Sequence, residues 1–493
     1  MPDTVEDGKS ATRGAALNGA AIASMALGSG LQLALYLRHF GTTRGTDAMI
    51  AALAVYSLVS VAGQVLRTTS VPFFAEPDPP LNQTVFGWTM AGITVAVTAV
   101  CTVFAEPIAK LVANSGGHAG VAVATTALRV MAPAIGLQVG GAGLAVVGAL
   151  RGRLGFVALS YIACGATGVL GYFALDHSTG VQVLAWTNVI SGATVVVILG
   201  VGLGIHPRRP TGLGTTLRAA GRLLHSVPLP MSFSLMYPIT LALAPRSRAG
   251  AITLFGLAYT LCSYLSGITA QALSMSDVIA LAQLGTSDAT DRRATVLRAF
   301  RYSLLIAVPA AGAAAVAGGP VLSALMPSRV GSSGAALGTD VVLLAPFLVA
   351  ALGVWVTLPA LLSTDHGFRG RRLVTLVLGL LAVHFAATLA GRALWGFDGV
   401  LIAMAVAPGV FVWFGLRRAA PQTALQLLRP AATICGVGAV SFGLVAVAIH
   451  PFAHLHGPLP GAIGAAIGTA IYALLAHRLY PVEAGTIARL ARR

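Results

Sequence analysis

The stretch that decides the fold is AALNGAAIASMALGSGLQLALYL (15–37), followed by the polar turn RHFGTTRGT (38–46) and by DAMIAALAVYSLVSVAGQVLRTTSVPFF (47–74). Each apolar run is long enough to cross a bilayer as a helix, which needs about 20 residues. The lipid interior offers the backbone no hydrogen-bond partners, so a spanning segment must satisfy its own N–H and C=O groups. The two runs and the turn between them therefore predict a pair of adjacent transmembrane helices.

The rest of the chain repeats this pattern. Of its 493 residues, 56% are hydrophobic and 9% are charged, and the mean hydropathy is +0.83. A soluble domain has about 25% charged residues. We predict an all-α polytopic membrane protein with about 14 transmembrane helices. The predicted spans are 15–37, 47–74, 85–105, 125–150, 154–175, 181–204, 224–245, 250–283, 300–318, 339–363, 372–391, 396–416, 430–450 and 458–479.

The basic residues indicate how the chain is oriented. The formal net charge of +16 arises from 31 Lys and Arg against 15 Asp and Glu. If the N-terminus is cytoplasmic, most of these cations fall in inner loops and termini, as the positive-inside rule requires. We expect a multi-pass protein of the inner (cytoplasmic) membrane with both termini cytoplasmic. The inner cations suit anionic lipids, whereas no basic stripe interleaved with aromatic residues indicates nucleic acid.

Motifs for chemistry are missing from the sequence. There is no P-loop of the GxxxxGK[ST] type, which argues against ATP hydrolysis. The loops are short and poor in the acidic residues that a membrane glycosyltransferase needs as a base or metal ligands. The four cysteines lie in apolar spans without a metal-binding spacing. We expect no enzyme activity, no cofactor and no metal site.

The chain also resembles itself. Pro107 and Pro133 recur as Pro320 and Pro346 at the same spacing, and each copy then ends a helix at Arg-Gly-Arg. VYSLVS (55–60) matches AYTLCS (258–263) in the same order. Two pseudo-symmetric six-helix bundles plus a C-terminal helix pair account for this repeat. The predicted domains are an N-terminal bundle (1–205), a cytoplasmic linker (206–226), a C-terminal bundle (227–420), and a transmembrane helix pair with a basic tail (421–493).

Several motifs resemble a known family. LRHFGTTRGTDAMIAAL (37–53) with SVPFF (70–74) resembles the start of the MurJ/MviN lipid II flippases of the MOP superfamily. PLPMSFSLMYPITLALA (228–244) resembles the opening of their second bundle, and ALRVMAP (127–133) a fourth-helix start. The resemblance covers most of residues 15–417 and is that of a divergent member. It implies a flippase that moves a lipid-linked cell-wall precursor during peptidoglycan biosynthesis.

The family's cavity arginines, which suit a pyrophosphate, are replaced here. Their positions are taken by Ala26, Gln32, Ser60, Val61 and Thr260. Arg38 and Asp47 are retained at the outer turn, where they form either an ion pair between two helices or a rim site for an anionic headgroup. This departure puts lipid II itself in doubt as the substrate.

The candidate substrate-binding residues are Arg38, Asp47, Gln32, Arg67, Thr260 and His384. Gln32 and Thr260 also suit interhelical hydrogen bonding, and Arg67 suits snorkelling to the inner surface. His384 stands near the middle of its span, where it would be either a proton acceptor or a neutral hydrogen-bonding group.

The sequence predicts a monomeric flippase that moves a lipid-linked or amphipathic envelope precursor by alternating access. A small-molecule or natural-product (multidrug-type) exporter is the first alternative. A non-transporting scaffold of the same fold is the second.

Overall fold

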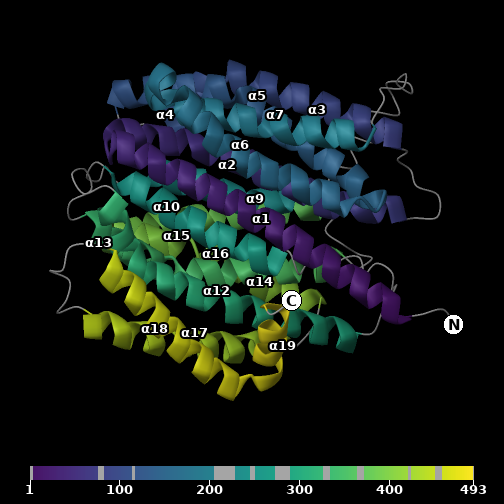
Figure 1. The fold of residues 1–493 in the computed structure, drawn as a ribbon, viewed down its shortest axis with the longest axis vertical. Coiled ribbons are helices and arrows are strands. Elements are labelled where there is room, and N and C mark those ends of the chain that lie inside the picture. Colours follow the sequence, from purple (N-terminus) through teal and green to yellow (C-terminus); the bar gives the residue numbers. More distant parts are fainter. Residues whose placement is uncertain are drawn as a thin grey trace. The chain divides into compact units, whose positions relative to one another are not determined.

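The computed structural model describes residues 4–75, 83–113, 117–204, 228–244, 250–271, 289–325, 333–362, 371–419, 423–449 and 458–491. Every regular element within these ranges is a helix (Figure 1), which confirms the predicted all-α class. The chain forms two compact units. The first comprises Met1–Ile252 and Phe368–Ala386, and the second comprises Thr253–Gly367 and Ala387–Arg493. The predicted linker (206–226) lies outside the described residues, and the predicted domain limits stay a prediction.

The first unit is built around α5. Its elements are α1 (Thr4–Phe40), α2 (Arg44–Ala75), α3 (Gln83–Val103), α4 (Ala105–Val112), α5 (Gly117–Leu150), α6 (Leu154–Thr179), η2 (Gly180–Gln182), α7 (Val183–Gly202), α9 (Pro228–Leu243) and the first part of α15 (Arg371–Ala403). α5 packs against α2, α3 and α7, while α1 packs against α6 and α9 against α2.

Small residues allow α1 and α6 to approach closely in this unit. A Cβ atom at Gly28 of α1 would lie 2.7 Å from the Cα of Gly165 on α6, and one at Gly165 would lie 2.9 Å from the carbonyl oxygen of Ser24. Helices in lipid gain little from burying apolar surface, so close backbone approach at small residues supplies much of their packing energy. The α1–α6 pair therefore depends on glycine at both positions.

The first Arg-Gly-Arg of the repeat ends α5 and also caps α7. Gly152 has φ 69°, the left-handed conformation that glycine adopts without strain. Arg151 donates to the carbonyl of Leu203 and Arg153 to that of Gly202, both at 2.7 Å. These carbonyls lie at the end of α7, where the helix dipole also favours cations. The motif thus fixes the α5–α6 turn to a neighbouring helix end.

The second unit is built around α12. Its elements are α10 from Thr253 on (Ala251–Ser266), the π-helical η3 (Gly267–Gln271), α12 (Ala289–Leu325), α13 (Ser333–Leu343), α14 (Ala345–Leu362), the second part of α15, α16 (Val406–Ala419), α17 (Thr423–Ile449), α18 (Leu459–Leu479) and α19 (Pro481–Ala491). α12 packs against α13, α17 and α18, and α14 packs against α16.

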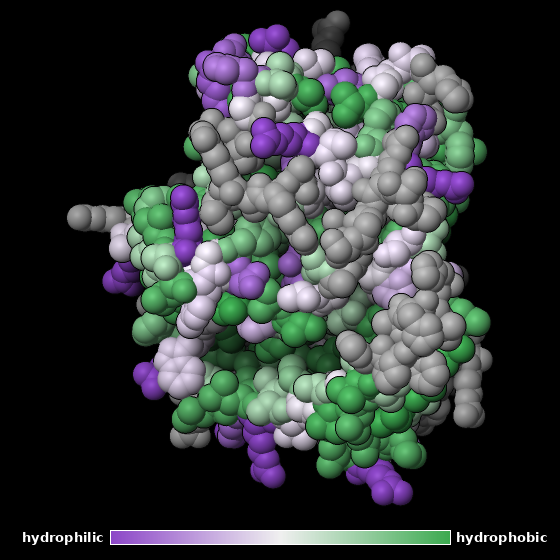
Figure 2. Space-filling view, turned by 90° about the vertical axis from the view of Figure 1, so that its left-hand side faces the viewer, coloured by the Kyte–Doolittle hydropathy of each residue, from purple (hydrophilic) through white to green (hydrophobic). Residues whose placement is uncertain are grey.

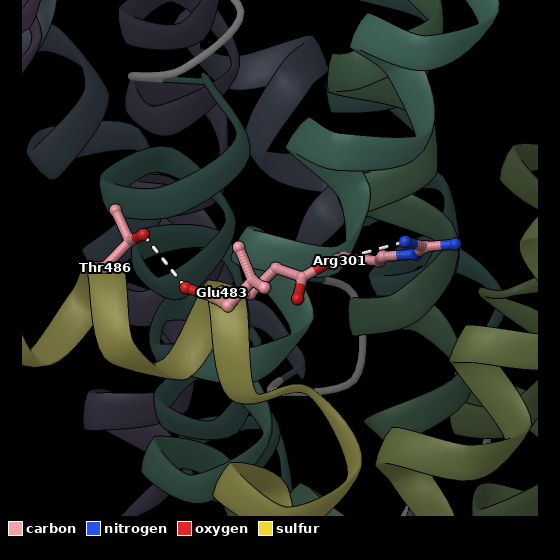
Figure 3. A network of polar contacts seen from close by, with 4 residues as sticks. Arg301, Glu483 and Thr486 are labelled. Carbon is pink, nitrogen blue, oxygen red and sulfur yellow. Dashed lines mark hydrogen bonds and ion pairs between the residues drawn. The ribbon is translucent and has the colours of Figure 1, made fainter.

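Polar contacts join the C-terminal helices to α12. The Arg301 guanidinium lies 3.4 Å from a carboxylate oxygen of Glu483 in the first turn of α19 (Figure 3). On the same short helix, the Thr486 hydroxyl donates to the carbonyl of Val482 at 2.9 Å. Arg293 donates from Nε to Gln426 of α17 at 2.7 Å. The C-terminal helices are therefore held to α12 by side chains as well as by packing.

α15 contains the turn between two predicted spans. Trp395 and Gly396 have non-helical backbone angles, and Gly396 has φ 61°. A Cβ atom at Gly391 would overlap the backbone of Gly399, so the two arms of this turn touch through glycines. The break falls at Trp395, between the predicted spans 372–391 and 396–416, and at Gly396, the first residue of the second span.

The helices have the length and surface of membrane spans. Ten described helices are long and apolar enough to cross a bilayer, or up to 11 if the pair 336–343 and 345–358, bent by 43°, forms one span. Large apolar side chains face outward, among them Leu27 (76% exposed) and Val201 (79% exposed). Figure 2 shows a face on which hydrophobic residues are widespread and hydrophilic ones are scattered or project at the margin. This is a multi-pass membrane protein, and the count of fourteen spans stays a prediction.

Candidate functional site

Gln32 faces the inside of the first unit. Its side chain is 7% exposed, and a methyl group at Gly168 of α6 would overlap its amide nitrogen. The same methyl group would lie 2.7 Å from the Ser191 hydroxyl oxygen of α7, which itself donates to the carbonyl of Cys164 at 3.1 Å. The Gln32 amide is therefore enclosed where α1, α6 and α7 meet. This placement favours the interhelical role over direct contact with cargo.

A second polar pair joins α2 to α5. Gln138 donates from Nε2 to the Tyr56 hydroxyl at 2.6 Å, and both residues are half-buried. The Tyr56 ring packs beside Cys101, Ala132 and Ile135. Tyr56 belongs to the repeated motif VYSLVS (55–60), but nothing in that motif indicates Gln138 as its partner.

His384 is completely buried on the first part of α15. Its Nε2 lies 3.0 Å from the hydroxyl oxygen of Thr240 and 3.0 Å from the carbonyl oxygen of Met236, both on α9. A carbonyl oxygen only accepts, so Nε2 carries a proton and donates. The geometry therefore favours a hydrogen-bonding group that joins two helices. The sequence predicts a neutral hydrogen-bonding group as one of two roles for His384, but it does not identify the partners, which lie on a distant segment.

The turn between α1 and α2 orders α2 through reciprocal capping. The Thr43 backbone N–H donates to the Thr46 hydroxyl at 2.7 Å, and the Thr46 N–H donates to the Thr43 hydroxyl at 3.2 Å. This is the geometry of a capping box, with threonine at both positions. It starts α2 at a defined residue and so places Asp47 in the first turn.

Asp47 is directed to the start of α10. It is 8% exposed, and its Oδ2 accepts a hydrogen bond of 2.9 Å from the backbone N–H of Gly250. A carboxylate at a helix N-terminus is favoured by the helix dipole. Arg38 is exposed at the end of α1, and in the described part of the chain no ion pair joins it to Asp47. The described contact of Asp47 is thus directed to α10, and the choice between an ion pair and a rim site stays a prediction.

Two candidates remain, Arg67 and Thr260. Arg67 lies on α2, but its side chain is outside the described residues. Thr260 is half-buried on α10 in the second unit. Within the described residues, Gln32, Arg38 and Thr260 make no hydrogen bond or ion pair with any other candidate. The six residues thus form no single described cluster, and no group of three or more His, Cys, Asp or Glu able to hold a metal occurs in the same ranges.

Comparisons with known proteins place the fold. No sequence model of a protein family matches the chain, and no curated protein matches it. Among solved structures, the lipid II flippase MurJ in an inward closed conformation is similar with a TM-score of 0.66 and 13% identity, over 94% of this chain and 98% of that one. The MATE multidrug transporter DinF-BH is similar with a TM-score of 0.59 and 14% identity, over 87% and 96%. A mutant of the Vibrio cholerae MATE transporter VcmN is similar with a TM-score of 0.57 and 11% identity, over 85% of this chain and 98% of that one.

These likenesses span nearly the whole of each chain, whereas the identities are low enough that they establish the fold alone. The family resemblance expected from residues 37–53 and 228–244 is confirmed at the level of the fold. This chain has the fold shared by the MurJ flippase and the MATE transporters of the MOP superfamily.

Proposed function

We propose that the protein is a transporter that moves a lipid-linked or amphipathic envelope precursor across the cytoplasmic membrane by alternating access. The fold supports this, because a lipid II flippase and multidrug transporters have it. Transporters built from parallel repeats rock two bundles around a site near the bilayer midplane. The proposal needs no chemical reaction, cofactor or metal. We further propose that the protein acts as a monomer.

The inferred charge of the cargo rests on where the Arg and Lys side chains lie. Every Arg or Lys side chain whose burial is described is exposed, apart from Arg293 and Arg301, which are half-buried near the start of α12. Gln32 and Thr260 occupy family arginine positions and are neutral. An unpaired pyrophosphate in a low-dielectric interior costs at least several kcal/mol. We therefore infer a cargo that is neutral or less anionic than lipid II.

The main test is complementation of a strain depleted of its lipid II flippase. A well-expressed, correctly inserted wild-type protein should fail to restore growth, whereas Thr260→Arg should restore growth in part because it returns a cation to a half-buried position. Thr260→Gln is the matched control for side-chain size. Full rescue by the wild-type protein would contradict the inferred cargo.

A second assay separates the alternatives. Cells that express the protein are loaded with the fluorescent cation ethidium, since multidrug transporters share this fold. Export of the dye above the vector control would favour the multidrug-type exporter. A purified protein that moves neither the dye nor a fluorescent polyprenyl-linked sugar in liposomes would favour the non-transporting scaffold.

The orientation is tested with reporter fusions. We propose cytoplasmic termini and an inner surface that binds anionic lipids through its arginines. Fusions after His118, His177, Arg329 and His454 should be outside, and fusions after Arg153, Arg301 and Arg371 inside. Inverted signals throughout either half would contradict this orientation.

A further inference from the structure

α9 contains a position at which its own hydrogen bonding is interrupted. Pro238 lies inside this helix and is buried. Proline has no N–H, so the carbonyl of Ser234 loses its usual intrahelical donor and is crowded by the proline ring. Sharp bends in helices occur mainly at such residues. The angle between the two parts of α9 is therefore not fixed by the helix itself.

The imidazole of His384 spans this interruption. Met236 precedes Pro238 and Thr240 follows it, and Nε2 of His384 lies 3.0 Å from an oxygen of each. One N–H can serve both oxygens only while they are close together on the same face of α9. That spacing changes when the helix bends about Pro238. The contact is therefore compatible with one bend angle of α9 and is weakened at other angles.

Because His384 lies on α15, its contact with α9 also affects how α15 is held in the first unit. Two residues after it, the helix passes from the first unit to the second, between Ala386 and Ala387. The backbone of α15 stays helical through this point and is interrupted only at Trp395 and Gly396. α9 packs against α2 and α4 in the first unit. A hydrogen bond from His384 to α9 therefore ties the first part of α15 to the body of that unit.

In a membrane this hydrogen bond contributes more to holding the two helices together than the burial of apolar surface does. Apolar contacts between helices gain little when lipid is the alternative, so packing and polar contacts decide which helices stay together. Residues 376–383 (LVLGLLAV), which precede His384, are all apolar or glycine. The imidazole thus brings a directional contact to a segment that otherwise offers only packing.

We propose that His384 is a conformational lock: its Nε2–H holds α9 in one bend at Pro238 and keeps the first part of α15 attached to it. A change in the bend of α9 must break this contact. His384 is then a positioning residue and does not bind cargo. Its part in a transport cycle rests on the proposed function, but the lock itself concerns helix geometry and needs no cargo for its test.

The test measures the bend directly. Spin labels are placed on α9 at Met231 and Ala242, on either side of Pro238, in full-length protein whose four native cysteines are replaced by alanine. Pulsed electron paramagnetic resonance in lipid nanodiscs then gives the distance distribution. The variants are His384→Leu, which removes the donor, His384→Gln, which keeps an N–H, and Thr240→Val, which removes one acceptor at equal size. His477→Leu, at an exposed histidine of α18, is the control.

The wild type, His384→Gln and His477→Leu should share one narrow distribution. His384→Leu and Thr240→Val should populate a second distance. The population at that distance should be about tenfold higher than in the wild type, because a buried hydrogen bond is lost. Thr240→Val decides the test even if His384→Leu fails to fold. A wild-type distance distribution in Thr240→Val would overturn the lock. So would a wild-type distribution in a folded His384→Leu that merely unfolds at a lower temperature, since His384 would then only stabilise the helix pair. A failure of transport assays leaves this measurement unaffected.

Discussion

Replacing Gly168 with alanine tests where the Gln32 side chain lies. The added methyl group would overlap the Gln32 amide nitrogen and lie 2.9 Å from its Cδ and 2.7 Å from the Ser191 hydroxyl oxygen. Ordinary carbon contacts begin at about 3.5 Å, so both neighbours must move. Because Gln32 is 7% exposed, its amide has little space into which it can move.

The expected cost follows from two opposing terms. Overpacking a close-packed interior costs about 1–3 kcal/mol. Alanine gains up to about 1 kcal/mol over glycine in a helix. We therefore expect Gly168→Ala to lower the free energy of unfolding by about 1–2 kcal/mol. Gly92→Ala is the matched control, since a Cβ atom there has nothing within 4 Å, and it should be neutral or slightly stabilising.

A double-mutant cycle identifies the obstacle. The free energy of unfolding is measured by SDS titration, followed by tryptophan fluorescence, for Gly168→Ala, Gln32→Ala and both together. If the Gln32 amide is the obstacle, the double variant should recover about 1–2 kcal/mol relative to the sum of the single changes. Additive effects would place the obstacle at Ser191 instead. A Gly168→Ala protein as stable as Gly92→Ala would mean that Gln32 points elsewhere, and the case for contact with cargo would return.

The other predictions concern Asp47 in the first unit and the Arg301–Glu483 pair in the second. Asp47→Ala should lower the free energy of unfolding by about 1–3 kcal/mol, because the N–H of Gly250 loses its acceptor, whereas Arg38→Gln should change it by less than about 0.5 kcal/mol; equal costs in SDS titration would contradict this. The side chains of Arg301 and Glu483 are 38% and 17% exposed, so a double-mutant cycle on Arg301→Gln and Glu483→Gln should give a coupling of about 1 kcal/mol or less. A coupling of several kcal/mol would mean that the pair is shielded from solvent.

The helices could be predicted from the sequence because their signal is local. A run of apolar residues of membrane length leaves the backbone no alternative to a helix. The turn within α15 is a clear case, since the predicted spans 372–391 and 396–416 leave a gap that contains Trp395 and adjoins Gly396. The Arg-Gly-Arg motif likewise predicts a helix end, which Gly152 provides.

The limits of prediction appear where partners are far apart in the chain. Asp47 and Gly250 are 203 residues apart, and Thr240 and His384 are 144 apart. Nothing near any of these residues specifies its partner, so proximity in the chain alone suggests Arg38, and not Gly250, as a partner of Asp47. The carboxylate turns to α10 because a helix N-terminus offers a backbone N–H donor and a favourable dipole.

The proposed preference for a neutral cargo also fits the side chains whose surroundings are described. Gln32 is enclosed between α1, α6 and α7, and His384 is engaged with α9, so neither is available to replace a missing arginine. Asp47, after the turn between α1 and α2, is buried and would repel a phosphate if ionised. An anionic group entering the interior would therefore depend on Arg67, or on cations at the helix ends. A cargo whose polar part is neutral avoids this requirement, and such a cargo could still use its apolar part to stay in contact with lipid.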